Sequence, residues 1–194
     1  RAWFIADGGG SPRLEVARVT AGDPRQDPEF LHYAIDRILP HACEPLFDIA
    51  ADVEKYPEFL PGWVAVRTRR TDTAVYETDQ VLKFGPIRER FESKTHMERP
   101  HRIRVVSHSR TFKHFEVNWR FEPLEQGGCR VHLDSHVGFK SRYVKKVVGV
   151  IFPRTVDDVL AAFERRADEL ARKSALDRGG DGSLDSNEET ARER

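Results

Sequence analysis

Hydrophobic and polar residues alternate along much of the middle of the chain. In residues 115–124 (FEVNWRFEPL) every second side chain up to Phe121 is apolar, and residues 129–139 (CRVHLDSHVGF) show a similar alternation. A period of two is typical of a strand with one buried and one solvated face, as in antiparallel sheets. We predict further strands over residues 30–41, 63–70, 74–84, 87–97 and 102–109.

Two segments have helical spacing instead. Residues 42–59 place apolar side chains on one helical face, and Pro57 is expected to end that helix. Residues 142–172 carry a longer apolar stripe. Because Pro153 interrupts this stripe, we predict a kink or a break between Gly149 and Pro153.

The order of these elements predicts an α+β fold. One strand is followed by short helices, about six antiparallel strands and one long helix. Only that long helix is large enough to cover the apolar face of the sheet. The expected solution is a helix-grip, in which a curved antiparallel sheet of about six to seven strands wraps around the long C-terminal helix. The gap between sheet and helix must be packed solid or left open for an apolar ligand.

The folded domain is expected to span residues 29–172. Residues 1–28 contain GGG and three prolines without a sustained period, which predicts an irregular N-terminal extension. This segment starts at Arg1 rather than at a methionine, as expected of a processed or trimmed product. Residues 173–194 are polar and low in apolar content, so we expect a disordered tail.

The charge balance argues against a generally basic nucleic-acid-binding protein. Lys and Arg number 32, and so do Asp and Glu, giving a formal net charge of zero. We therefore expect no DNA partner. No apolar run approaches the ~18 residues that a membrane-spanning helix requires, so the protein is expected to be soluble or at most peripheral.

The two cysteines are Cys43 and Cys129. They lie far apart in the sequence and lack the CxxC spacing of redox or metal motifs. We therefore expect two reduced thiols, one near a helix start and one on a strand.

The chain contains none of the common catalytic motifs, such as GxSxG, a P-loop, GxGxxG or HExxH. His132 and His136 are four residues apart on a predicted strand, hence ~13 Å apart, too far to share one ion. We therefore predict no metal site and no catalytic residues. A cyclase-type enzyme with an acid–base pair in the cavity remains an alternative. Its candidate acid–base residues are Glu77, Asp79 and Glu89.

Four segments carry a resemblance to a known family: ADVEKYPEFLPGW (51–63), IRERFESK, FKHFEVNWRFEPLEQGGCRVHLD and VGFKSR. Together they resemble the coenzyme Q-binding START-domain family, part of the polyketide cyclase/dehydrase and lipid-transport superfamily. That superfamily includes a bacterial branch of ribosome-association toxins. The similarity covers residues 30–170. The chain departs from the family pattern in its long N-terminal extension and in VKKVVGVIFPRT (144–155).

The resemblance implies a START/Bet v 1-like helix-grip cavity that holds ubiquinone or a similar isoprenoid lipid, with no covalent cofactor. It also implies a role in respiration and a location in the mitochondrial matrix or on the matrix face of the inner membrane. In a prokaryote the corresponding location is the bacterial cytoplasm.

The segment YPEFLP (56–61) follows the first predicted helix. As part of a helix-grip fold, it would lie at one end of the cavity. Its prolines reduce conformational entropy, so the segment could form a rigid apolar lip that faces a lipid tail or a membrane. Alternatively, it could simply close the end of the hydrophobic core.

The predicted ligand-binding residues are apolar or aromatic side chains on the inward positions of these elements, although each would suit an ordinary core equally well. They are Phe47, Tyr56, Phe59, Leu60, Trp63, Phe91, Val105, Val117, Trp119, Leu133, Val137, Val144, Val148, Ile151 and Phe152. The candidate hydrogen-bond donors to a quinone head are Tyr76, Arg90, Trp119 and Tyr143.

The leading hypothesis is a non-enzymatic module that binds ubiquinone or a related polyprenyl quinone lipid and supports its delivery or use in respiratory electron transport. The alternative is an interaction protein docked on a ribosome or a respiratory complex. Basic clusters such as RTRR (67–70) and RPHRIR (99–104) could serve docking or contact with the inner membrane. They could equally form a solvated sheet surface paired with nearby carboxylates.

Overall fold

The computed structural model of the 194-residue chain describes residues 20–21, 30–70 and 72–179. The side chains of residues 151–157 lie outside the described set. The described elements are, in chain order, β1 (Thr20–Ala21), β2 (Phe30–Leu39), α1 (Cys43–Ala51), η1 (Val53–Lys55), α2 (Tyr56–Phe59), β3 (Trp63–Arg70), β4 (Val75–Phe84), β5 (Ile87–Glu98), β6 (Arg102–Val106), β7 (Phe112–Pro123), β8 (Cys129–Phe139) and α3 (Arg142–Gly179).

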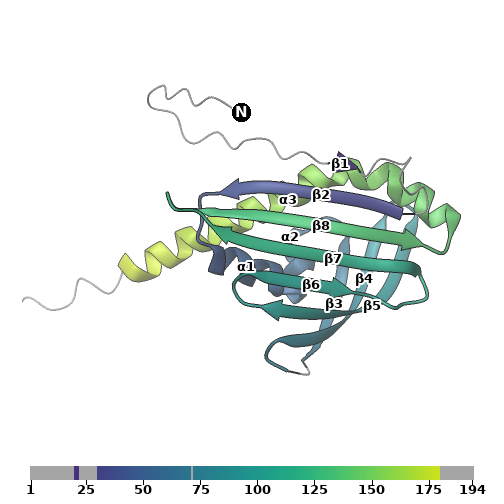
Figure 1. The fold of residues 1–194 in the computed structure, drawn as a ribbon, viewed down its shortest axis with the longest axis horizontal. Helices are drawn as coiled ribbons and strands as arrows, with labels where there is room; N and C mark the ends of the chain where they lie inside the picture. The colour runs from purple at the N-terminus through teal and green to yellow at the C-terminus, as the bar shows by residue number, and fades with distance from the viewer. Residues whose placement is uncertain (1–19, 22–29, 71, 180–194) are drawn as a thin grey trace, which may run out of the picture.

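The strands form one curved antiparallel sheet. Among the described residues it has eight strands in the order β1-β2-β8-β7-β6-β5-β4-β3, and β1 is only two residues long. Strands β3 to β8 pair with their neighbours in the sequence, while β2 returns to pair with β8. The long helix α3 lies behind the sheet, which curves around it (Figure 1). The predicted helix-grip α+β fold is therefore confirmed.

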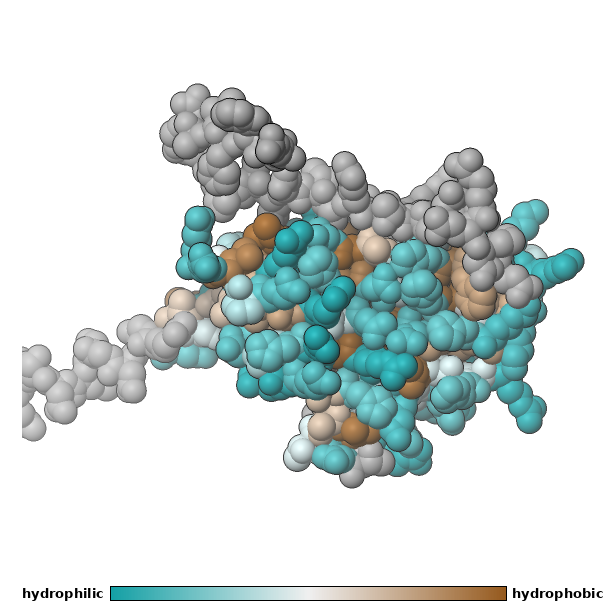
Figure 2. Space-filling view, in the orientation of Figure 1, coloured by the Kyte–Doolittle hydropathy of each residue, from teal (hydrophilic) through white to brown (hydrophobic). Residues whose placement is uncertain are grey.

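The two faces of the sheet differ sharply in polarity. Along β5 the burial alternates, with Ile87, Phe91, Ser93 and Thr95 buried and the residues between them mostly exposed. The outer face of β2, β8, β7 and β6 is mostly hydrophilic, with isolated hydrophobic residues (Figure 2). The inner face thus supplies the core, as the alternation predicts.

The helical segments differ from the prediction in where they end. The first helix ends at Ala51, and Pro57 lies in the first turn of α2 instead of ending a helix. The first turn tolerates proline because its backbone N–H groups have no partner within the helix. Pro153 does not divide α3, which is continuous from residue 142 to residue 179 and so extends past the predicted domain end at 172.

The predicted terminal segments are only partly within the described residues. The predicted extension, residues 1–28, contributes β1, which pairs antiparallel with β2, and its other residues lie outside the described set. In the predicted disordered tail, residues 173–179 are instead helical. Residues 180–194 lie outside the described set.

The prediction of two reduced cysteines is wrong in this structure. Cys43 and Cys129 form a disulfide bond between the first residue of α1 and the first residue of β8. The sheet register explains this, because Leu39, at the end of β2, lies opposite Cys129 and a short turn leads from it to Cys43. The two Cα atoms are 5.2 Å apart, which is within the range for a disulfide.

Candidate functional site: an internal apolar cavity

A cavity of about 250 Å³ lies between the inner face of the sheet and α3. Its lining comes from the strands β2 to β8, from α1, η1 and α2, and from α3. Most of the lining side chains are aliphatic or aromatic. The volume is slightly below the ~300–1,000 Å³ typical of small-molecule sites, so the cavity suits a ring-sized group or a short apolar segment.

Most of the predicted binding residues line this cavity. They are Tyr56, Leu60, Trp63, Phe91, Val105, Val117, Trp119, Leu133, Val137, Val144 and Val148. Phe47 lies instead in the packed core at 1% exposure, where its ring meets Phe121 edge-on. The side chains of Ile151 and Phe152 are outside the described set.

The sequence-based list missed several lining residues. From β2 it omitted Leu31, Tyr33, Ile35 and Arg37, which share one face of the strand because they alternate. The period of two, applied to β2 as it was to β7 and β8, would have indicated all of them.

The YPEFLP segment contributes Tyr56 and Leu60 to the cavity lining. The Tyr56 hydroxyl donates a 2.6 Å hydrogen bond to the carbonyl oxygen of Ala50, and the Tyr76 hydroxyl donates one of 2.9 Å to that of Ala51. Both carbonyls belong to the last turn of α1, where no helical donor remains for them. Burial raises the pKa of Tyr56 well above its usual value, so this hydroxyl stays protonated and can donate.

Phe59, in the same segment, faces α3. Its ring packs edge-on against Phe163, and the Arg166 guanidinium lies 5.7 Å from its centroid. Tyr56 and Leu60 are 7% and 4% exposed. In this structure Tyr56 and Leu60 therefore line the cavity as buried side chains, and Phe59 packs against α3.

A small polar network occupies the β4–β5 side of the interior. The Trp63 indole donates to Gln80 Oε1 at 3.1 Å, and Gln80 Nε2 donates to Thr78 and Ser93 at 2.8 and 3.0 Å. The Thr78 and Ser93 hydroxyls are themselves 2.6 Å apart. Because these groups satisfy one another, burying them carries little penalty.

Arg37 differs from these residues. It lines the cavity from β2, opposite Val131 on β8. Its Nε atom is buried and has no hydrogen-bond partner. A buried donor without an acceptor costs free energy that a ligand oxygen could recover, so Arg37 is the strongest candidate to bind a polar head.

The four donors predicted from the sequence are placed less favourably than Arg37 for binding a polar head. Arg90 points outward and forms an ion pair with Asp79, which lowers the pKa of that carboxyl mainly through their hydrogen bond. Tyr143 is 64% exposed, and Tyr76 is already bonded to α1. Trp119 lines the cavity as predicted.

Of the three candidate carboxylates, only Glu89 lines the cavity, where it accepts a 3.2 Å hydrogen bond from Thr111. Glu77 pairs with Arg69 on the outer face, as Asp79 does with Arg90. The basic clusters on the sheet therefore include several cations paired with neighbouring carboxylates, as a solvated sheet surface would have.

No helix within residues 30–70 and 72–179 is long and apolar enough to cross a membrane.

Comparison with known proteins identifies similar sequences from two functional groups. The ribosome association toxin RatA of Pseudomonas aeruginosa is 25% identical over 139 residues, covering 72% of this chain and 96% of that protein. The mitochondrial coenzyme Q-binding protein COQ10 homolog B of Xenopus laevis is 27% identical over 144 residues, covering 72% of this chain. The match spans 59% of the length of the Xenopus protein.

Solved structures agree with the fold. The solution structure of an 18 kDa protein from Caulobacter crescentus is 28% identical, with a TM-score of 0.61, covering 72% of this chain and 97% of that one. The Zhui aromatase/cyclase of a Streptomyces species has a TM-score of 0.65 at 12% identity and covers 75% of this chain and 98% of its own. At that identity, the likeness shows the fold alone.

The family model described as polyketide cyclase/dehydrase and lipid transport matches residues 39–164, which is more than half of the chain. The resemblance found in the sequence is thereby confirmed. The chain belongs to the polyketide cyclase/dehydrase and lipid transport family.

Proposed function

We propose that this protein binds ubiquinone or a related polyprenyl lipid in its cavity and supports the delivery or use of that lipid in respiratory electron transport. The apolar lining supports this proposal, and so does the similarity to a protein named as coenzyme Q-binding. The proposed location is the matrix side of the mitochondrial inner membrane or, in a bacterium, the cytoplasm.

The observation that carries the proposal is the unpartnered Nε of Arg37 in an apolar cavity. Burying an isoprene unit gains about 3–4 kcal/mol relative to water. A bilayer offers the same gain, however, so tail burial alone cannot extract the lipid from a membrane. Selective binding needs a polar contact with the head, and a quinone carbonyl oxygen is an acceptor that Arg37 can bind.

We propose binding rather than catalysis as the primary role. A cyclase would need an acid–base pair facing its substrate. Glu89 and Glu164 are the carboxylates that line the cavity within the described residues, and Glu89 is bonded to Thr111. Release of a chemically unchanged lipid would distinguish a binding protein from a cyclase.

Fluorescence quenching by a short-chain ubiquinone tests the proposal, because Trp63 and Trp119 both line the cavity. We expect saturable quenching in the parent protein. Replacing Arg37 by Met should weaken binding at least tenfold, since a hydrogen bond from a charged group contributes roughly 1.5–3 kcal/mol. Arg120→Met is the matched control, because Arg120 is exposed on the outer face of β7. Unsaturable quenching in the parent, or equal affinities for the two variants, would contradict the proposal.

The second candidate function is docking on the ribosome, favoured by the similarity to proteins named ribosome association toxins. Co-sedimentation of the purified chain with ribosomes separates the two candidates. If the chain sediments stoichiometrically and shows no saturable quenching by ubiquinone, docking is the primary function.

A further inference from the structure

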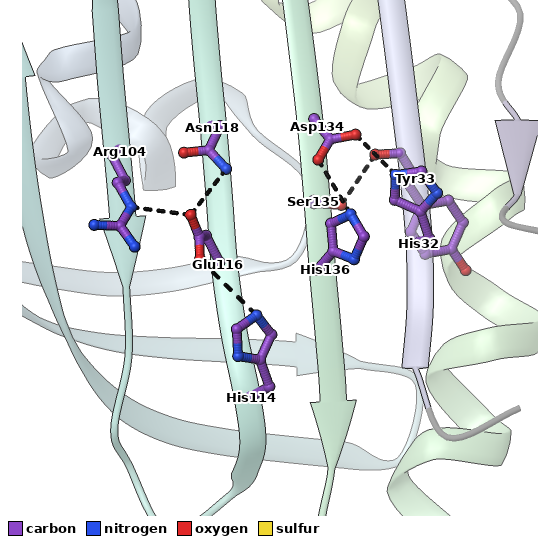
Figure 3. Close-up of polar contacts among 9 residues, drawn as sticks. All are labelled: His32, Tyr33, Arg104, His114, Glu116, Asn118, Asp134, Ser135 and His136. Carbon is purple, nitrogen blue, oxygen red and sulfur yellow. Dashed lines mark hydrogen bonds and ion pairs between the residues drawn. The ribbon is translucent and has the colours of Figure 1, made fainter. Parts of the chain in front are cut away.

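A second group of chemically active side chains lies on the opposite, outer face of the sheet. His32 on β2 and Asp134 and His136 on β8 occupy even-numbered positions, whereas the cavity is lined by odd-numbered positions of the same two strands. His32 is paired directly with His136 across the strands, and Asp134 lies one position along on the same face. The cavity lining therefore does not include these residues, whose side chains lie close together across β2 and β8 (Figure 3).

The three side chains converge through their ligating atoms. His32 Nε2 lies 2.8 Å from Asp134 Oδ2, and His136 Nε2 lies 3.3 Å from Asp134 Oδ1. One such atom from each of the three residues fits within a mutual separation of 4.8 Å. In a tetrahedral zinc site with bonds of about 2.0–2.1 Å, neighbouring ligand atoms are about 3.3–3.4 Å apart, so small side-chain rotations would complete the geometry.

The two imidazole rings and the carboxylate together present three ligand atoms to a divalent cation. The two imidazole rings lie against each other with centroids 4.2 Å apart and share one carboxylate. A divalent ion binds imidazole in its neutral form and also attracts the carboxylate.

The three side chains are exposed enough for a bound metal ion to take further ligands. The His32, Asp134 and His136 side chains are 32%, 39% and 49% exposed, so water can reach the metal. Glu116, which lies opposite His136 on β7, accepts hydrogen bonds from Arg104 at 2.9 Å and Asn118 at 3.1 Å. These two partners hold Glu116 in place. Water molecules, rather than Glu116, would therefore complete the coordination of the metal ion.

We propose that His32, Asp134 and His136 form a binding site for a first-row divalent metal ion of the zinc type on the outer face of the sheet. Imidazole nitrogen and carboxylate oxygen suit such ions, and two histidines with one carboxylate leave an open position, as in known zinc sites. Two of the ligands come from β8 and one from β2, so the bound ion would also cross-link these neighbouring strands.

Calorimetric titration of the metal-free full chain with Zn²⁺ tests the site. We expect one ion per chain and at least a tenfold loss of affinity in His32→Gln and in Asp134→Asn. His114→Gln is the matched control, because His114 lies on the neighbouring strand with its Nε2 4.0 Å from Glu116, and within the described residues it belongs to no such group of three. Its affinity should stay within twofold of the parent value.

Two outcomes would overturn the proposal. One is the absence of stoichiometric Zn²⁺ uptake by the parent. The other is an equal loss of affinity in His32→Gln and His114→Gln, which would mean diffuse binding to surface histidines. Circular dichroism of each variant verifies that it is folded, and Co²⁺ absorption spectra report the ligand geometry independently of affinity. Because the cavity lies on the other face, a negative result here leaves the lipid-binding proposal intact.

Discussion

Arg37 is the residue that most distinguishes this interior from an ordinary core. Its inward position follows from the alternation along β2, and its Nε is buried without a partner. The protein therefore retains a side chain that lowers its stability in the absence of a ligand. Such a trade of stability for binding is typical of functional sites.

Replacement of Arg37 by Met should stabilise the ligand-free protein. Removing an unsatisfied buried donor should raise the free energy of unfolding by about 1 kcal/mol, measured by urea denaturation. The same variant should bind ubiquinone more weakly, so stability and affinity should change in opposite directions. A loss of stability larger than 1 kcal/mol would show that Arg37 supports the fold instead.

Tyr56→Phe should destabilise the protein by about 1–3 kcal/mol. The substitution keeps the ring contacts with Trp63 and Phe163 but leaves the Ala50 carbonyl without its hydroxyl donor. Thermal denaturation measures the effect. Tyr143→Phe is the control, since Tyr143 is exposed, and equal melting temperatures for the two variants would refute the argument.

For single residues, the sequence predicts the face of the sheet to which a side chain points better than it predicts the residues that the side chain contacts. Alternation places Val117, Trp119 and Leu133 correctly on the cavity wall. His132 and His136 share the outer face of β8, but four residues of extended chain place them ~13 Å apart, too far to share an ion. The contact of His136 with His32 depends on the pairing of β2 with β8, strands separated by most of the domain, and a single sequence does not reveal that register.

At the scale of elements, the strands were predictable and the helix boundaries were not. Residues 63–70 and 129–139 form strands with the predicted bounds, because turns and alternation mark them locally. The helix expected over residues 42–59 divides at Asp52 because the Tyr56 and Tyr76 hydroxyls satisfy the end of α1. Those bonds are tertiary contacts, and helical periodicity carries no signal for them.

The disulfide joins α1 to β8 across a sequence separation of 86 residues. Replacing both cysteines with Ser should lower the free energy of unfolding by about 2–5 kcal/mol under oxidising conditions. Each single variant should lose a similar amount, because either substitution removes the same bond. Thiol titration of the denatured, unreduced parent should find no free thiol, and finding two would contradict the bond.

At the scale of the whole molecule, the sheet separates two kinds of chemistry. Its inner face and α3 enclose an apolar cavity, and its outer face carries ion pairs and the His32–Asp134–His136 group. The fold class was predictable because only one long helix is available to cover the sheet. The choice between lipid binding and ribosome docking was not, because relatives named for each activity are similarly close to this chain.

The most direct test of the central claim is the lipid content of the purified chain. Organic extraction followed by mass spectrometry should recover a polyprenyl quinone at close to one molecule per chain. Leu133→Trp, which fills the cavity from β8, should recover much less while retaining the circular dichroism spectrum of the parent. If the parent contains no lipid, or if the folded Leu133→Trp variant contains as much lipid as the parent, the cavity is not the binding site.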